Sequence, residues 1–183
     1  MSCLTLTSSI CRGCRDNAGG IKKVYAANIC DITAITHNTT ATDADHSITG
    51  ITNTGAWFEL IPNKNSSNWT ENINASVENG TIFYEQVATL VFGKNTQALR
   101  NTVQEICDSD LLLVIEDNNG IFWAIGEMGN GAMVTGGTSA SGTAWGDLNG
   151  WNLTITCDSR VPACTVDPTV VASFIDEEKK CGC

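Results

Sequence analysis

Cysteine is the residue type with the widest choice of chemistry in this chain, and nine cysteines occur in 183 residues. Cys11 and Cys14 form a CxxC pair, and Cys181 and Cys183 form a CxC pair. Four thiolates suit Zn²⁺, so these residues are a candidate zinc site that would join the two basic ends of the sequence. Against it, CxC is an uncommon half of a structural zinc site and no second CxxC exists. Buried or terminal thiols are therefore the favoured interpretation, and we expect no cofactor.

A second possible metal site lies in a Thr-rich segment that contains both histidines, His37 and His46. Asp43 and Asp45 would share one face of a strand and could bind a metal ion together with His46. A solvated loop is the simpler interpretation. The GxSxG, Walker and HExxH motifs are all absent, so we expect no catalytic residues and no enzyme activity.

The Gly-rich stretch 126–137 could be mistaken for a phosphate-binding loop. It carries Glu127 and no lysine or arginine, and it lies between two candidate strands rather than before a helix. A hairpin with tight turns is the better interpretation.

Five tryptophans offer either core packing or a binding face. Trp57, Trp123 and Trp151 fall within strand patterns and are expected in the core. Trp69 and Trp145 fall within loop patterns, where they could anchor in a neighbouring subunit or stack against a glycan.

The charge distribution excludes one class of function. Residues 24–178 contain four basic side chains against nineteen acidic ones, and the remaining basic residues gather at the two ends. A body this acidic repels nucleic acid and anionic lipid and lacks the counterion release on which unspecific nucleic-acid binding depends. We expect the protein not to grip DNA, although DNA could slide past it.

The sequence shows no secretory signal pattern and no apolar run of membrane-spanning length, so we expect no membrane partner. It does contain N-x-S/T sequons, which a chain rich in Asn and Thr generates by chance; they begin at Asn38, Asn65, Asn68, Asn74, Asn79 and Asn152.

The polar residues are mainly Thr, Asn, Ser and Gly, and only 16% of the chain is charged, which is typical of a β protein. The expected fold is mainly β, a β-sandwich or partial barrel with one flanking α-helix at about 95–108, a long loop and two terminal arms. The helix rests on apolar spacing from Ala98 to Cys107 after an N-cap at Asn95 or Thr96. The expected division is an N-terminal arm over 1–20, a single β-rich domain over 21–157 with its long loop at 63–80, and a C-terminal arm over 158–183.

Strand patterns occur at 21–28, 57–61, 81–92, 111–116, 121–126, 133–135 and 151–156. Residues 117–120, Asp-Asn-Asn-Gly, predict a hairpin turn between two of these strands. The polar segment 63–80 is interpreted as a long loop or a weak hairpin, of the kind that oligomers use to reach their neighbours.

Three pieces of sequence carry a family resemblance: CRDNAGGIKKVYAANICDIT, TIFYEQVATLVFGKNTQALRNTVQEICDSDLLLVIEDNNGIFWAIGE and SGTAWGDLNGWNLTIT. Over about residues 12–165 the chain resembles small virion structural proteins of tailed bacteriophages that infect Bacteroidetes. In its order of elements it also resembles the tail tube class. The nine cysteines and the terminal CGC depart from the general pattern, so the arms could have a particular role here.

The resemblance implies a structural protein that self-assembles into rings, commonly hexameric, which stack into a conduit for DNA ejection. Such a protein is located in the virion, in the phage tail, after assembly in the bacterial host cytoplasm, and its partners are its own copies and other virion proteins. Candidate interface residues are Trp69, Trp145, Asn68, Lys22 and Lys23, and candidate acidic residues of the lumen are Glu59, Glu85, Glu116 and Glu127. A tail terminator, neck or capsid decoration protein, and a glycan-binding β-sandwich module, are the alternatives.

Overall fold

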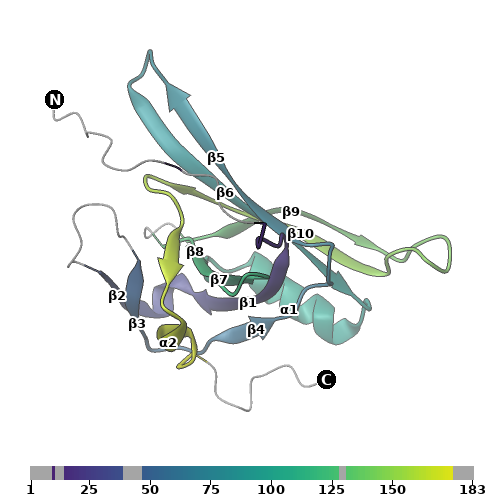
Figure 1. Cartoon of the computed structure of the whole chain (residues 1–183). Helices are drawn as coiled ribbons and strands as arrows, with labels where there is room; N and C mark the ends of the chain where they lie inside the picture. Colours follow the sequence, from purple (N-terminus) through teal and green to yellow (C-terminus); the bar gives the residue numbers. More distant parts are fainter. Residues whose placement is uncertain (1–9, 11–14, 39–46, 128–130, 175–183) are drawn as a thin grey trace.

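The computed structural model describes residue 10 and residues 15–38, 47–127 and 131–174 (Figure 1). The four candidate zinc ligands, and Asp43, Asp45 and His46, lie outside these residues. The strands and helices are, in chain order, β1 (Ile21–Asn28), η1 (Ile29–Asp31), β2 (Ile32–His37), β3 (Ile48–Asn53), β4 (Phe58–Leu60), β5 (Asn68–Ser76), β6 (Thr81–Gly93), α1 (Gln97–Cys107), β7 (Leu111–Asp117), β8 (Phe122–Ile125), β9 (Met133–Ala140), β10 (Gly150–Ser159), β11 (Cys164–Val166) and α2 (Pro168–Val171).

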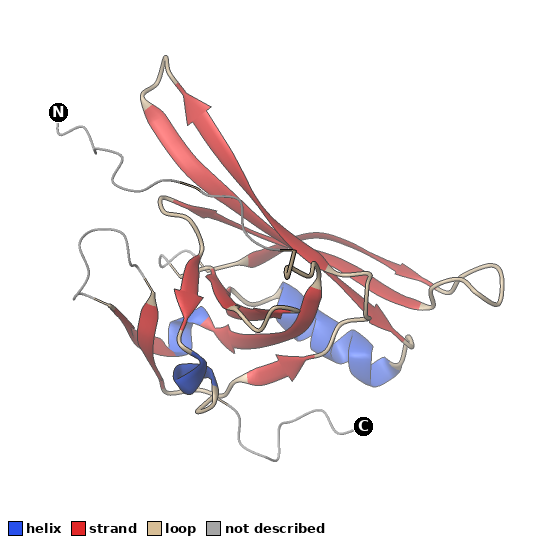
Figure 2. Cartoon of the chain, in the orientation of Figure 1, coloured by secondary structure: helices blue, strands red, loops and turns tan. Residues whose placement is uncertain are grey.

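The expected fold class is confirmed, because the chain is mainly β and folds into two sheets with one substantial helix, α1 (Figure 2). One sheet has seven strands in the order β2-β3-β11-β8-β7-β1-β4, and the other has four in the order β5-β6-β10-β9. No helix in the described part of the chain is long and apolar enough to cross a membrane.

Strand β7 is an interior strand of the seven-stranded sheet, between β8 and β1, and its continuous apolar run explains this position. Leu111, Leu113 and Ile115 point into the core between the two sheets, while Leu112 and Val114 point into a second core on the opposite face. All five side chains are buried. A strand that is apolar on both faces must be covered on both faces, which places it inside the molecule.

The four-stranded sheet covers one face of the seven-stranded sheet with alternate residues of its strands. Ala88, Leu90 and Ile155 are fully buried in the shared core, whereas their immediate neighbours face outward. Strand β6 pairs antiparallel with β5 on one side and with β10 on the other, and β9 completes the sheet next to β10.

Helix α1 has Thr96 as its N-cap, whose side chain accepts a hydrogen bond from the Leu99 N–H at 3.2 Å, and Asp108 is its C-cap. Val103 is buried, and Ile106 packs against the core between the sheets. The helix predicted at about 95–108 is therefore confirmed, with Thr96 rather than Asn95 as its N-cap.

Of the two interpretations of 63–80, the long loop is wrong for most of its length, because residues 68–76 are strand β5, whereas the hairpin is partly right. This strand forms a hairpin with β6 from Asn68 opposite Thr89 to Ser76 opposite Thr81. Its sequence, NWTENINAS, has only two large apolar residues, so the strand pattern was weak; pairing with the strongly β-forming strand β6 supplies the missing order. In the same way β9 continues to Ala140, beyond the strand pattern recognised at 133–135.

The boundaries of both arms need correction. Residues 158–159 end β10, β11 joins the seven-stranded sheet, and the Phe174 ring stacks on Trp57 with a centroid separation of 3.9 Å. Apolar burial of this segment outweighs the loop signals of its two prolines. At the other end, the backbone N–H of Ala18 donates to Asn119 Oδ1 at 2.7 Å, which fixes part of the predicted N-terminal arm on the β7–β8 turn.

Candidate functional site

The outer face of the four-stranded sheet is a regular surface that the chain's own described elements leave uncovered. Its positions are set by strand alternation, since the residues between the buried ones point away from the core. Polar side chains without charge predominate there: Asn68, Thr70, Asn72, Asn74, Ser76, Thr81, Thr89, Asn152, Thr154, Thr156, Thr135 and Thr138.

The charges on this surface have one sign. None of the four strands contains a lysine, an arginine or a histidine. Glu85 and Asp158 are directly opposite each other on β6 and β10, and Asn72 Nδ2 donates a hydrogen bond to Glu85 Oε2 at 3.2 Å. The third acidic residue, Glu71, faces the sandwich, where it accepts hydrogen bonds from Gln86 and the Ala163 N–H. The outer face is therefore neutral to acidic along its whole length.

Both edges of this sheet are free in the described structure, since β5 and β9 each pair on one side only. Natural sheets protect such edges with lysine, proline, or a charged side chain that points inward. Strand β9 has no charged residue and no proline, whereas β5 has one protecting residue, the inward Glu71. The sheet therefore has one edge without such protection, at β9, and one edge with a single protecting residue, at β5, and both can serve as templates for pairing with further strands.

The β5–β6 hairpin extends beyond the body of the molecule, as Figure 1 shows. Large apolar side chains are exposed near its tip: Ile73 (66%), Val77 (98%), Ile82 (57%) and Phe83 (39%). A soluble monomer seldom presents several large apolar residues on one projecting element, so the tip is a candidate contact with another protein.

The loop after β9 presents a second apolar anchor, Trp145, which is fully exposed. Asp147 Oδ2 accepts hydrogen bonds from the N–H groups of Ala144 at 2.7 Å and Thr143 at 2.8 Å. These bonds hold the pKa of the Asp147 carboxyl below its usual value and fix the turn that carries the tryptophan. The loop is thus a built feature and not an unstructured connection.

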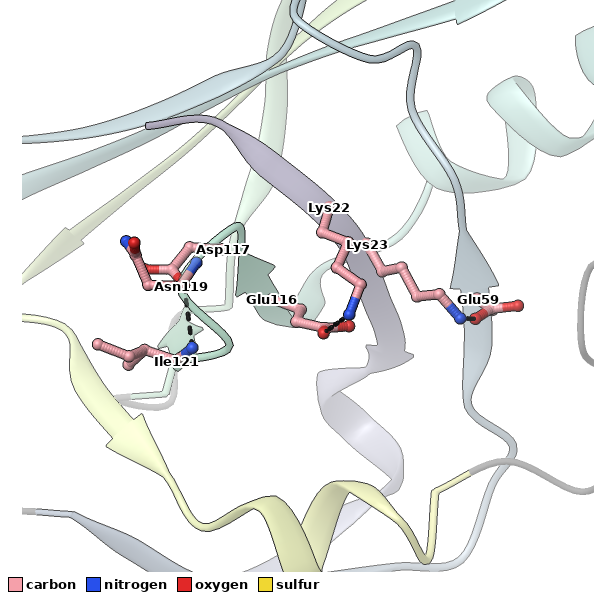
Figure 3. A network of polar contacts seen from close by, with 7 residues as sticks. All are labelled: Lys22, Lys23, Glu59, Glu116, Asp117, Asn119 and Ile121. Atoms are coloured by element: carbon pink, nitrogen blue, oxygen red, sulfur yellow. Dashed lines mark hydrogen bonds and ion pairs between the residues drawn. The ribbon is translucent and has the colours of Figure 1, made fainter. Parts of the chain in front are cut away.

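Two of the four acidic residues expected in a lumen are instead paired with lysines of the same chain (Figure 3). Glu59 and Glu116 are buried in the seven-stranded sheet, where Lys23 Nζ lies 2.6 Å from Glu59 Oε1 and Lys22 pairs with Glu116. The hydrogen bond to Glu59 raises the pKa of Lys23. Lys22 and Lys23, expected at an interface, therefore neutralise their own chain's carboxylates, a role that strand patterns alone could not reveal.

Of the other predicted residues, some lie inside the sandwich and some on its outer face. Trp69 packs against Trp123 with ring centroids 5.3 Å apart, so it fills the sandwich and is not a free anchor. Asn68 is exposed on the outer face at the start of β5, and Trp145 is exposed as expected. Glu85 alone of the four candidate carboxylates is on the outer face, where Asp158, which was not predicted, lies beside it.

Glu127 belongs to a different cluster, in which its Oε1 lies 2.6 Å from His37 Nε2. Cys164 lies close to both. Burial, and then the Glu127 carboxylate, raise the pKa of the Cys164 thiol to about 12, so this thiol is a poor nucleophile.

No family model, no curated protein and no solved structure matches this chain.

Proposed function

We propose that this chain is a structural subunit of a tailed-bacteriophage virion, and specifically a tail tube protein whose copies form stacked rings around a DNA conduit. The observation that carries the proposal is the four-stranded sheet, which combines two free edges with strands that contain no lysine, arginine or histidine. The family resemblance of the sequence points in the same direction.

The strand order suits a closed ring. Each neighbouring pair in β5-β6-β10-β9 is antiparallel, so β5 and β9 run in opposite directions. When β9 of one copy lies beside β5 of the next, the antiparallel alternation continues without interruption. Because this contact joins two different edges, it repeats head to tail and closes by rotation.

Such a ring would enclose a channel. Barrels of roughly 16–18 strands already surround water-filled pores. A hexamer that contributes four strands a copy exceeds that size. The outer face of the sheet would line the channel, because the opposite face is packed against the seven-stranded sheet.

The lining chemistry suits the passage of DNA. Threonine, asparagine and serine offer hydrogen bonds but no fixed positive charge, and Glu85 and Asp158 repel phosphate. DNA that meets no lysine or arginine releases no counterions and gains no lasting attachment. Contacts between rings would use the projecting β5–β6 hairpin and the Trp145 loop, whose exposed apolar side chains need a protein partner.

Terminator, neck and decoration proteins share the need to self-assemble, and they remain alternatives within the same virion class. The glycan-binding alternative loses its platform, because Trp69 packs on Trp123 and only Trp145 stays exposed. The two tryptophans are also far apart along the sheet. Trp69 is level with Ile155 of β10, whereas the loop that carries Trp145 ends at Gly150, five residues or roughly 17 Å along the same strand.

The test is negative-stain microscopy with light scattering of the full chain. Rings or tubes are expected for the natural sequence. Replacing Thr70 and Thr138 with lysine places a charge on each free edge and should leave folded monomers. Gln104→Lys, on the exposed side of α1, is the matched control and should assemble normally. A natural chain that stays monomeric at high concentration, or an edge variant that still forms rings, would contradict the proposal.

A further inference from the structure

Three side chains with different metal-binding groups meet at one end of the seven-stranded sheet. His37 is the last residue of β2, Glu127 follows β8, and Cys164 is the first residue of β11. One imidazole nitrogen, one carboxylate oxygen and the thiol sulfur all lie within 4.8 Å of one another. Cys164 is buried, the Glu127 side chain is 8% exposed and the His37 side chain is 35% exposed, so the cluster is accessible from one side.

We propose that His37, Glu127 and Cys164 bind a zinc ion, with water as the fourth ligand. The set combines the three donor types that Zn²⁺ uses in proteins. Thiolate favours zinc over magnesium and calcium, which prefer oxygen ligands alone. This site is distinct from the candidate site at Cys11, Cys14, Cys181 and Cys183, and it does not depend on the proposed role in a tail tube.

The geometry needs only side-chain adjustment. Ligand distances of about 2.0–2.3 Å around a tetrahedral zinc place neighbouring donor atoms roughly 3.3–3.6 Å apart. The His37 Nε2–Glu127 Oε1 distance, now 2.6 Å, must lengthen by somewhat less than 1 Å. The other donor atoms lie within 4.8 Å of one another, so their separations must shorten by at most about 1.5 Å. His37 has the exposure to make this movement. On binding, the ion takes the place of the thiol proton, which passes to solvent.

The position of the cluster gives such an ion a structural role. Strands β2 and β3 form a hairpin that joins the rest of the seven-stranded sheet through β11, and the β3–β11 register contains one pair, Val166 with Ile48. His37 belongs to this hairpin, whereas Glu127 and Cys164 belong to the other side of that junction. An ion held by all three would connect the two sides where the strand pairing is shortest.

Metal binding is tested on the full chain in which Cys3, Cys11, Cys14, Cys181 and Cys183 are replaced by serine, so that terminal thiols contribute nothing. Titration with Co²⁺, a spectroscopic substitute for Zn²⁺, should give one equivalent with thiolate-to-cobalt absorption and the intense visible bands of a tetrahedral site. Zn²⁺ should displace the cobalt. At free Zn²⁺ about 100 times Kd the Tm should rise by about 5–10 °C.

Adding Cys164→Ser should abolish the thiolate absorption, and His37→Gln should weaken Co²⁺ binding at least tenfold while leaving the fold intact, since His37 is partly exposed. Cys157→Ser is the matched control, because Cys157 is another buried strand thiol outside the cluster. The proposal is supported if the five-serine chain binds one equivalent of Co²⁺ and that binding is lost when Cys164 or His37 is replaced. Two results would overturn the proposal and leave a plain hydrogen-bonded cluster. One is no Co²⁺ binding by the five-serine chain, and the other is Co²⁺ binding that neither Cys164→Ser nor His37→Gln changes.

Discussion

The two sheets of this molecule satisfy their polar groups in opposite ways. In the seven-stranded sheet, the buried carboxylates of Glu59 and Glu116 each have a lysine of the same chain. In the four-stranded sheet there is no basic residue to pair with, and Glu85 and Asp158 lie side by side on an open face. The first sheet has its buried carboxylates paired and both faces covered within one chain, whereas the second leaves one face open.

This difference separates stability from function. The seven-stranded sheet is covered on both faces by apolar side chains and holds the fold together. The four-stranded sheet contributes one face to that core, and in the proposed tube its other face would line the conduit. Changes in the first sheet should therefore alter the free energy of unfolding, and changes on the outer face of the second should alter assembly and DNA passage.

The largest expected loss of stability comes from the C-terminal segment that covers the second core. Phe174→Ala removes a buried ring stacked on Trp57 and should cost about 3–5 kcal/mol in the free energy of unfolding, measured by urea denaturation. Deleting residues 175–183 is the control and should cost far less. An unchanged midpoint for Phe174→Ala would show that this segment is an arm after all.

The next effect tests the ion pairs, and it should be asymmetric. Lys23→Met leaves the carboxylate of Glu59, whose side chain is 3% exposed, without its lysine and should cost about 1–3 kcal/mol. Glu59→Gln should cost less, because Lys23 is 36% exposed and can turn to water. Equal losses in urea denaturation would mean that the buried side of the pair does not dominate.

A smaller effect is expected at alkaline pH. The hydrogen bond to Glu59 raises the pKa of Lys23 above 10.5, and burial raises the pKa of Tyr25 above 10.0. Both groups hold their protons longer in the folded state, so their contribution is complete below pH 10 and is lost as the pH rises through the raised values. Urea midpoints between pH 8 and 11.5 should fall above pH 10, and Tyr25→Phe should make that fall shallower.

The smallest change in stability should accompany the clearest change in function. Glu85→Lys on the outer face should alter the free energy of unfolding by about 0.5 kcal/mol or less. It should nonetheless make assembled tubes retain DNA, with an affinity that falls steeply as salt is added. Glu116→Lys is the contrast, because it removes a buried pair in the other sheet and should destabilise the fold. Tubes of Glu85→Lys that ignore DNA at low salt would place the outer face away from the conduit.

Much of the architecture was accessible from the sequence, because local patterns carried it. The apolar run of β7, the Asn-Gly turn after it and the period of α1 each predicted the element that is observed. Strand β5 and the Gly-containing half of β9 were missed, since their own residues favour turns and only pairing with β6 and β10 makes them strands. The pairing partner supplies the order that propensity lacks.

The candidate site was harder to predict, because the sequence does not show whether a given Asp or Glu is paired or exposed. The acidic excess and the absence of lysine from the four strands are properties of the sequence alone, and they already disfavour DNA binding. Only the folded chain decides that Lys22 and Lys23 neutralise Glu116 and Glu59, that Glu85 meets Asp158, and that His37, Glu127 and Cys164 converge. Net charge depends only on which residues a chain contains, whatever its fold. An ion pair or a cluster of ligands forms only where folding brings strands that are distant in sequence within a few ångströms of each other.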